Sequence, residues 1–383
     1  MRKEGLIKYN SFTVVLLVFI YSITTIFSIF VNQGYLIIGL SLVVVGPMIV
    51  MNYTYDLRTR NILALIFDIL ILLVLVVQYL THSMYQDAIL TTLINFLGIG
   101  TLGLLVGASR IDMDCCIRYL KGFAYVGLVV SVVYLVMIRG NFAYSMRFGY
   151  GLLPSAMAFL LFYYKESKIY YLGLLGFCFV LLMAWGSRGA LLAILLFFFV
   201  YLLRNKNWVM LLLGLLLVVL LWGLLMQIME EVVYFVSDLT GARKIEGILN
   251  MVSGETDLME SSSGREALYR HALQLFLQEP FGTGVGYWAY DPAMSGLYPH
   301  NIFLQVATEL GIFGLLALLA ILAVTIVRLV RMDRDSFLFW GMLFSITYGR
   351  LMVSSTLWER PEFWLLTGAM LFGTSRSEKK SDA

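Results

Sequence analysis

The chain has 383 residues, of which 60% are hydrophobic and only 13% are charged, and its formal net charge is +3. A soluble globular protein carries about a quarter charged residues, so the composition excludes a soluble domain and indicates a polytopic membrane protein. The sequence has three cysteines and three histidines and offers no cluster of metal ligands. No cysteine lies in the long polar loop described below, so packing and not disulfides must order that loop.

We predict an all-α protein with about twelve membrane helices, because apolar stretches of about 20 residues are long enough to cross a bilayer. No small-residue cleavage site follows the first stretch, which is therefore predicted to be a membrane helix and not a signal peptide. The last stretch is short and the reversal at Ser187 is tight, so these could be re-entrant. The stretches lie near residues 12–31, 34–51, 62–80, 88–107, 117–138, 148–164, 169–186, 189–203, 208–236, 301–327, 336–353 and 361–373.

The distribution of Lys and Arg predicts the orientation, since cytoplasmic loops carry an excess of both. With both termini in the cytoplasm, most of the 27 basic residues fall in cytoplasmic segments. Residues 237–299, between the ninth and tenth spans, then form an external loop subdomain within a single membrane domain of residues 1–383. The external basic residues are nearly all arginine, whose planar fork of donors suits phosphate; lipid headgroups alone could explain Arg139 and Arg360. The basic residues predicted to be external are Arg139, Arg147, Arg188, Arg243, Lys244, Arg265, Arg270, Arg350 and Arg360.

The motif Gly186-Ser187-Arg188-Gly189 separates two predicted spans. Its glycines and serine permit a tight reversal and let backbone N–H groups approach a ligand beside the guanidinium. An arginine at membrane depth is costly unless it meets an anion or water, although an arginine that extends to lipid headgroups would also fit. Arg147, which precedes Phe148-Gly-Tyr-Gly-Leu-Leu-Pro154 at the outer start of another span, is a second candidate for binding phosphate.

A short amphipathic helix is predicted within the external loop. Ser263 and Glu266 form a capping box at its start, and Pro280 ends it. Arg265 lies in the first turn, where the helix dipole disfavours a cation; an anionic partner would explain it, and so would simple solvation. The polar stripe contains Glu266 and Arg270, and the apolar face consists of Leu268, Ala272, Leu275 and Phe276.

Two further motifs follow this helix. Gly282-Thr-Gly-Val-Gly286 is not a nucleotide-binding fingerprint, because no strand precedes it, and we predict a flexible turn that returns the loop over the site. Pro299-His300-Asn301 opens the next span. The positive end of that helix favours a neutral imidazole, so His300 is a candidate general base, although a histidine that only caps the helix fits as well. His271 is expected to be a structural or surface histidine.

Together these segments resemble the O-antigen ligase/polymerase superfamily of bacterial membrane glycosyltransferases. The resemblance covers residues 147–330 and rests on several motifs in the expected order. They are Arg147 before Phe-Gly and Pro154, Gly186-Ser-Arg188-Gly-Ala-Leu-Leu, Arg265 leading into Glu279-Pro-Phe-Gly-Thr-Gly-Val-Gly286, and Pro299-His300-Asn301-Ile-Phe-Leu followed by Glu309-Leu-Gly-Ile-Phe-Gly314.

The resemblance implies a GT-C-like membrane fold and metal-independent, inverting glycan transfer on the outer face of the bacterial plasma membrane, with no cofactor. The donor would be an oligosaccharide linked to undecaprenyl diphosphate, and the acceptor a glycan or a lipid. Arg147, Arg188 and Arg265 would bind the diphosphate, with His300 as the base, Arg188 as a further catalytic group, and Asn301 and Arg270 in support. A chain-length regulator and a flippase are implied partners; nucleic acid is not.

Three functions remain open, besides a weaker reading as a sensor or scaffold without chemistry. A polymerase would join lipid-linked repeat units into O-antigen, capsule or exopolysaccharide, and the short chain without an appended soluble domain favours this reading. An O-antigen ligase would move the finished glycan to lipid A core in lipopolysaccharide or to another acceptor. A transporter or flippase of lipid-linked sugars would show repeat symmetry and polar residues within several spans, whereas here the spans are nearly uncharged and the polar residues gather at one face.

Overall fold

The computed structural model describes residues 3–137, 146–184, 188–207, 209–210, 212–213, 231, 265–291 and 297–373, and these residues form helices and no strand. The first half comprises α1 (Lys3–Thr25), η1 (Ile26–Ile29), α2 (Gln33–Tyr55), α3 (Thr59–Thr81), η2 (Ser83–Tyr85), α4 (Gln86–Asn95), the π-helical turn η3 (Phe96–Gly100), α5 (Thr101–Ala108) and α6 (Met113–Met137). The predicted all-α class is thus confirmed.

The second half contains α7 (Met146–Glu166), α8 (Tyr170–Ala184), α9 (Arg188–Arg204), α14 (Arg265–Gln278), η5 (Tyr287–Ala289), α15 (Ile302–Arg331), α16 (Arg334–Leu351), η6 (Leu357–Glu359) and α17 (Pro361–Phe372). Every predicted span coincides with helix except 208–236, which lies almost wholly outside the described residues. Among those residues, six helical segments are long and apolar enough to cross a membrane. The total of about twelve spans and the GT-C type stay predictions.

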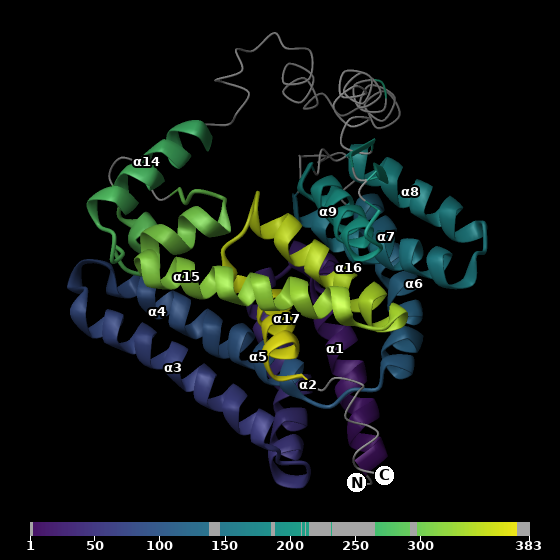
Figure 1. Cartoon of the computed structure of the whole chain (residues 1–383), viewed down its shortest axis with the longest axis horizontal. Coiled ribbons are helices and arrows are strands. Elements are labelled where there is room, and N and C mark those ends of the chain that lie inside the picture. Colours follow the sequence, from purple (N-terminus) through teal and green to yellow (C-terminus); the bar gives the residue numbers. More distant parts are fainter. Residues whose placement is uncertain are drawn as a thin grey trace.

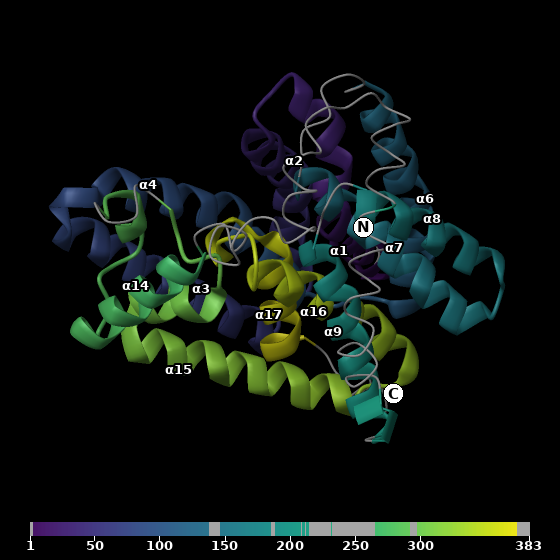
Figure 2. The same cartoon turned by 90° about the horizontal axis from the view of Figure 1, so that it is seen from above.

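Two views at right angles agree on the arrangement of the helices. They show α3, α4 and α14 on one side of the molecule, α6, α7 and α8 on the other, and α1 and α17 between them (Figures 1 and 2). The central position of α17 explains why nearly all of its residues are buried although it has only 12. The short last helix is therefore part of the core.

The connections predicted to be cytoplasmic contact one another. The Arg60 guanidinium at the start of α3 donates to the carbonyl of Gly373 after α17 at 2.9 Å. Lys165 at the end of α7 pairs with Asp335 at the start of α16 at 2.6 Å, and Arg204 at the end of α9 donates to the carbonyl that follows α15. These segments therefore share contacts at their ends, as alternating spans require. The side of the membrane that they face stays a prediction.

Small residues bring α17 into close contact with α5. A Cβ atom on Gly107 would lie 2.1 Å from the carbonyl oxygen of Leu365, and one on Gly103 would lie 2.7 Å from that of Pro361. Gly368 faces the Leu104 carbonyl in the same way. Glycines four residues apart let two helix backbones approach closely in a membrane, so this contact determines where the start of α17 lies.

The glycine run after α14 fills a break in α15. Gly311 has φ 65° and ψ −160° inside that helix, and the carbonyls freed there accept from the N–H groups of Thr283 (2.8 Å) and Gly284 (3.1 Å). Gly282 and Gly286, like Gly284, have positive φ, which glycine adopts without steric cost. In place of the predicted flexible turn, the run is a hydrogen-bonded insertion that joins the segment after α14 to α15.

The predicted loop helix is α14, which begins at Arg265 and ends before Pro280. Its predicted apolar face is confirmed: Leu268, Ala272 and Leu275 are buried, and the helix packs on α15. The predicted capping residue Ser263, like the rest of residues 237–264 of the predicted external loop, lies outside the described residues.

Candidate functional site

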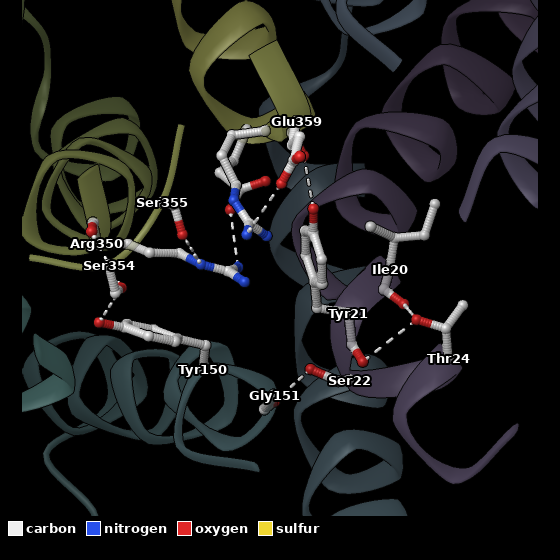
Figure 3. Close-up of polar contacts among 12 residues, drawn as sticks. Ile20, Tyr21, Ser22, Thr24, Tyr150, Gly151, Arg350, Ser354, Ser355 and Glu359 are labelled. Carbon is white, nitrogen blue, oxygen red and sulfur yellow. Dashed lines mark hydrogen bonds and ion pairs between the residues drawn. The ribbon is translucent and has the colours of Figure 1, made fainter. Parts of the chain in front are cut away.

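Four helix ends bring polar side chains together at the ends opposite to those that carry the Arg60, Lys165 and Arg204 contacts. Tyr21 lies near the end of α1, Tyr150 in the first turns of α7, Arg350 in the last turn of α16, and Arg360 directly before α17. Figure 3 shows Arg350 directed between the two tyrosine rings. We call Arg350, Arg360, Tyr21, Tyr150 and Glu362 the arginine cluster.

Arg350 is buried and fully engaged. Its guanidinium carbon lies 4.2 Å from the centre of the Tyr21 ring and 4.6 Å from that of Tyr150, distances at which a cation is attracted to the face of a ring. Its Nε donates to Ser355 at 3.2 Å, and its Nη1 donates to Glu362 Oε1 at 3.2 Å. Because both side chains of the Arg350–Glu362 pair are less than a tenth exposed, at 7% and 5%, solvent screens this ion pair little.

Arg360 is only partly satisfied. It lies on the same Tyr21 ring, 4.7 Å from the centre, and its side chain is 12% exposed. Its contact with the Glu359 carboxylate is long, 4.0 Å, and the Glu359 side chain is 51% exposed. The Nε and Nη1 atoms of Arg360 are buried without a hydrogen-bond partner. Such donors are rare in folded proteins and call for an explanation.

Hydrogen bonds hold the tyrosines in place. The Tyr21 hydroxyl donates to the backbone carbonyl of Glu359 at 2.6 Å, and Ser354 donates to the Tyr150 hydroxyl at 2.6 Å (Figure 3). A third bond, from Ser22 to the carbonyl of Gly151, joins α1 to α7. The rings are thus tied to η6 and to the segment after α16, which preorganises the surfaces on which both guanidinium groups lie.

The predicted phosphate-binding arginines occupy helix starts. Arg147 is the second residue of α7, while Arg188 and Arg265 begin α9 and α14; their side chains lie outside what the structure describes. The backbone at the start of α9 nevertheless lies against Tyr150 and Val353. A Cβ atom on Gly189 would lie 1.9 Å from the Tyr150 hydroxyl and 2.6 Å from Val353 Cγ2. The backbone at Arg188 therefore adjoins the arginine cluster.

His300 is in a constrained conformation. Its φ is 48°, in the left-handed region that costs non-glycine residues roughly 1–2 kcal/mol and that is over-represented at functional sites. The helix cap is Asn301, whose side chain accepts from the N–H groups of Phe303 (3.0 Å) and Leu304 (3.3 Å). The alternative that His300 merely caps α15 is therefore wrong, because Asn301 is the capping residue. The supporting role of Asn301 in a site stays a prediction.

The centre of the half-buried His300 ring lies 4.2 Å from the centre of the Tyr298 ring. Burial raises the pKa of the Tyr298 hydroxyl to about 12, and the Arg360 guanidinium offsets this in part. Tyr298 is therefore a neutral hydrogen-bond donor at physiological pH. Its electrostatic interaction with Arg360 also connects the His300 segment with the arginine cluster.

Two other predicted residues make contacts within the loop. His271 Nε2 lies 2.6 Å from Oδ2 of the buried Asp291, which agrees with the structural role expected for it. Arg270 is 68% exposed and pairs with Glu266 one turn earlier at 2.8 Å. An exposed i,i+4 pair of this kind contributes only about 0.3–0.5 kcal/mol to stability. This contact does not support the role in the site that was predicted for Arg270.

The sequence does not single out Arg350 and Arg360 as site residues. Lipid headgroups alone could explain Arg360, whereas the structure buries its guanidinium against Tyr21. The available signal was Arg350 within the predicted span 336–353, since an ionisable residue at membrane depth is a functional candidate. In the sequence, Glu309 stands out only as the first residue of the motif Glu309-Leu-Gly-Ile-Phe-Gly314. It is buried and accepts from Trp358 and Gln305, which joins α15 to η6.

Residues 173–319 match the model of the O-Antigen ligase family. The match agrees with the resemblance of residues 147–330 to the O-antigen ligase/polymerase superfamily. The match includes Arg188, Arg265 and His300, and it supports a membrane-embedded enzyme that acts on a lipid-linked glycan. A search of curated proteins and a search of solved structures gave no match.

Proposed function

We propose that this O-antigen ligase-type protein polymerises lipid-linked oligosaccharide repeat units, taking each from undecaprenyl diphosphate on the outer face of the plasma membrane. The observation that supports this most is the partly satisfied arginine cluster beside the start of α9, in a chain whose residues 173–319 match the O-Antigen ligase model. A leaving diphosphate carries concentrated negative charge, and buried guanidinium groups are the side chains best suited to stabilise it.

In the proposed reaction, a hydroxyl oxygen of the acceptor forms a bond to the anomeric carbon of the donor sugar. The bond from that carbon to the diphosphate oxygen breaks, and the electron pair leaves with undecaprenyl diphosphate. His300 takes the hydroxyl proton, and Arg147, Arg188 and Arg265 stabilise the charge of the leaving group. A single displacement of this kind inverts the configuration at the anomeric carbon.

The proposed role of His300 rests on position as well as chemistry. The residue stands directly before the Asn301 cap of α15, where the positive end of the helix disfavours imidazolium. A neutral ring can accept a proton. A general base contributes about 10²–10⁴-fold in rate, which gives the scale of the loss expected on its removal.

The test uses the purified full-length protein in lipid nanodiscs with a lipid-linked repeat unit as both donor and acceptor. Wild-type protein is expected to form a ladder of longer lipid-linked glycans, and His300→Ala to lose about 10²–10⁴-fold of that rate while still binding donor. His300→Gln should also fail, because an amide is not a useful base. Variants that polymerise at the wild-type rate would remove His300 from the mechanism.

The same assay separates polymerase from ligase and transporter. Transfer of the glycan to lipid A core, with no lengthening of the lipid-linked repeat unit, would identify a ligase. Movement of the donor across a liposome membrane without any new glycosidic bond would identify a transporter. Either result would refute the proposed polymerase.

A further inference from the structure

We propose that the arginine cluster is a binding site for the sugar-phosphate end of the lipid-linked substrate, with Arg360 binding a phosphate oxygen and Glu362 accepting from a sugar hydroxyl. The inference rests on the proposed function and names residues outside the region 173–319. Three observations carry it: the charge balance of the cluster, the orphaned polar atoms, and the way in which the tyrosines hold both guanidinium groups.

The charge balance leaves a cation without a close counterion. Glu362 matches Arg350 in a short buried pair, 3.2 Å. The carboxylate that forms an ion pair with Arg360 is that of the half-exposed Glu359, at 4.0 Å, the outer limit of such a pair. Glu362 also attracts Arg360 electrostatically, but its short ion pair is with Arg350. A buried charge without a partner is strongly unfavourable. An anion at Arg360 would remove this penalty, and phosphate matches a guanidinium fork in shape and charge.

The orphaned atoms define the chemistry of the ligand. Buried Nε and Nη1 of Arg360 are two donors without an acceptor, and buried Oε2 of Glu362 is an acceptor without a donor. A ligand with both a hydrogen-bond acceptor and a hydrogen-bond donor would satisfy these atoms, and an oxyanion is the acceptor best suited to a guanidinium group. A sugar attached to phosphate has this combination, with the donor on a sugar hydroxyl.

The site is built before the ligand arrives. The Tyr21 ring has a cation–π contact with both arginines: the guanidinium carbons of Arg350 and Arg360 lie 4.2 and 4.7 Å from its centre. Tyr150, on α7, makes a further cation–π contact with Arg350. Holding two cations near one another is costly, and the cation–π contacts and Glu362 offset that cost. Binding therefore requires little side-chain ordering, apart from displacement of the Glu359 carboxylate by phosphate.

The test measures binding to full-length protein in nanodiscs, with the fluorescence of Trp358 and Trp364 near the cluster as the readout. The probes are undecaprenyl diphosphate, the same lipid bearing one sugar, and inorganic pyrophosphate. Arg360→Gln is expected to weaken binding of both lipids about 10–100-fold, the range for loss of hydrogen bonds to a charged group. Glu359→Gln should tighten binding, because it removes the competing carboxylate. The matched control is Arg331→Gln, an exposed arginine at the far end of α15.

Glu362→Gln separates the two halves of the proposed site. It should weaken binding of the sugar-bearing lipid more than that of undecaprenyl diphosphate, because only the former offers a sugar hydroxyl group. Arg360→Lys keeps the charge and should recover part of the affinity, which shows that loss in Arg360→Gln does not reflect misfolding. Pyrophosphate that competes with the lipid would show that the oxyanion alone occupies Arg360; pyrophosphate that does not compete would show that the lipid or sugar is also needed.

Wild-type affinity of Arg360→Gln for all three probes would overturn the inference. If that result accompanies normal glycan transfer by the wild-type protein and loss of transfer in His300→Ala, the proposed function stands and the arginine cluster is structural. If the wild-type protein binds lipid through Arg360 but forms no glycosidic bond with any acceptor, the binding site stands and the proposed function falls.

Discussion

Replacing Gly107 by alanine should displace α17 and disable the site without touching any polar residue. The Cβ atom would lie 2.1 Å from the Leu365 carbonyl oxygen and 2.7 Å from the Ala369 nitrogen, both backbone atoms that cannot rotate away. Ordinary contact begins near 3.4 Å, so the two helices must separate locally by about 1.3 Å. Overpacking of this kind costs about 1–3 kcal/mol in stability.

The displacement reaches the arginine cluster because Arg360 and Glu362 lie at the start of α17. A misplacement of about 1 Å can cost on the order of 10²-fold in rate, which is the loss of glycan transfer that we expect for Gly107→Ala. Transfer would be measured in nanodiscs and stability by thermal unfolding in detergent. Gly122→Ala in α6 is the matched control. A Cβ atom there meets nothing within 4 Å, so the helix should gain about 0.5–1 kcal/mol.

Gly107→Ala with wild-type stability and transfer would refute the close α5–α17 contact and with it the placement of the cluster. Loss of stability with normal transfer would show that the start of α17 is not part of the site. Both variants should accumulate in the membrane at comparable levels, since each adds a single methyl group within a helix.

Three other predictions concern the predicted site and orientation. Arg188→Lys keeps the charge but loses the fork, so transfer should fall strongly at normal protein levels; full activity would make Arg188 an interfacial anchor. In whole cells of a strain whose protein lacks the native cysteines, Ser262→Cys should react with a membrane-impermeant thiol reagent and Ser167→Cys should not; the opposite pattern would reverse the orientation. Asn301→Ala removes two accepted N–H bonds at the start of α15 and should cost about 1 kcal/mol in thermal unfolding, whereas an unchanged midpoint would show that the cap is dispensable.

The helices were predictable because hydropathy and capping signals are local. A run of apolar residues must form its own backbone hydrogen bonds in lipid, so the run itself dictates a helix. The α14 helix followed from the spacing of its apolar residues, such as Leu268 and Ala272, and from the stop at Pro280. Its start at Arg265 and its buried face agree with that reading.

The sequence by itself therefore determined the all-α class, most helix positions, the loop helix and the His300–Asn301 segment at the start of α15. The tertiary structure decided that Arg350 and Arg360, ten residues apart in the sequence, meet on a tyrosine more than 300 residues earlier in the chain. It also decided that the glycine run fills the break at Gly311. These outcomes depend on which helices pack together, and in a membrane that choice rests on backbone contacts at small residues such as Gly107, which leave no periodic signal in hydropathy.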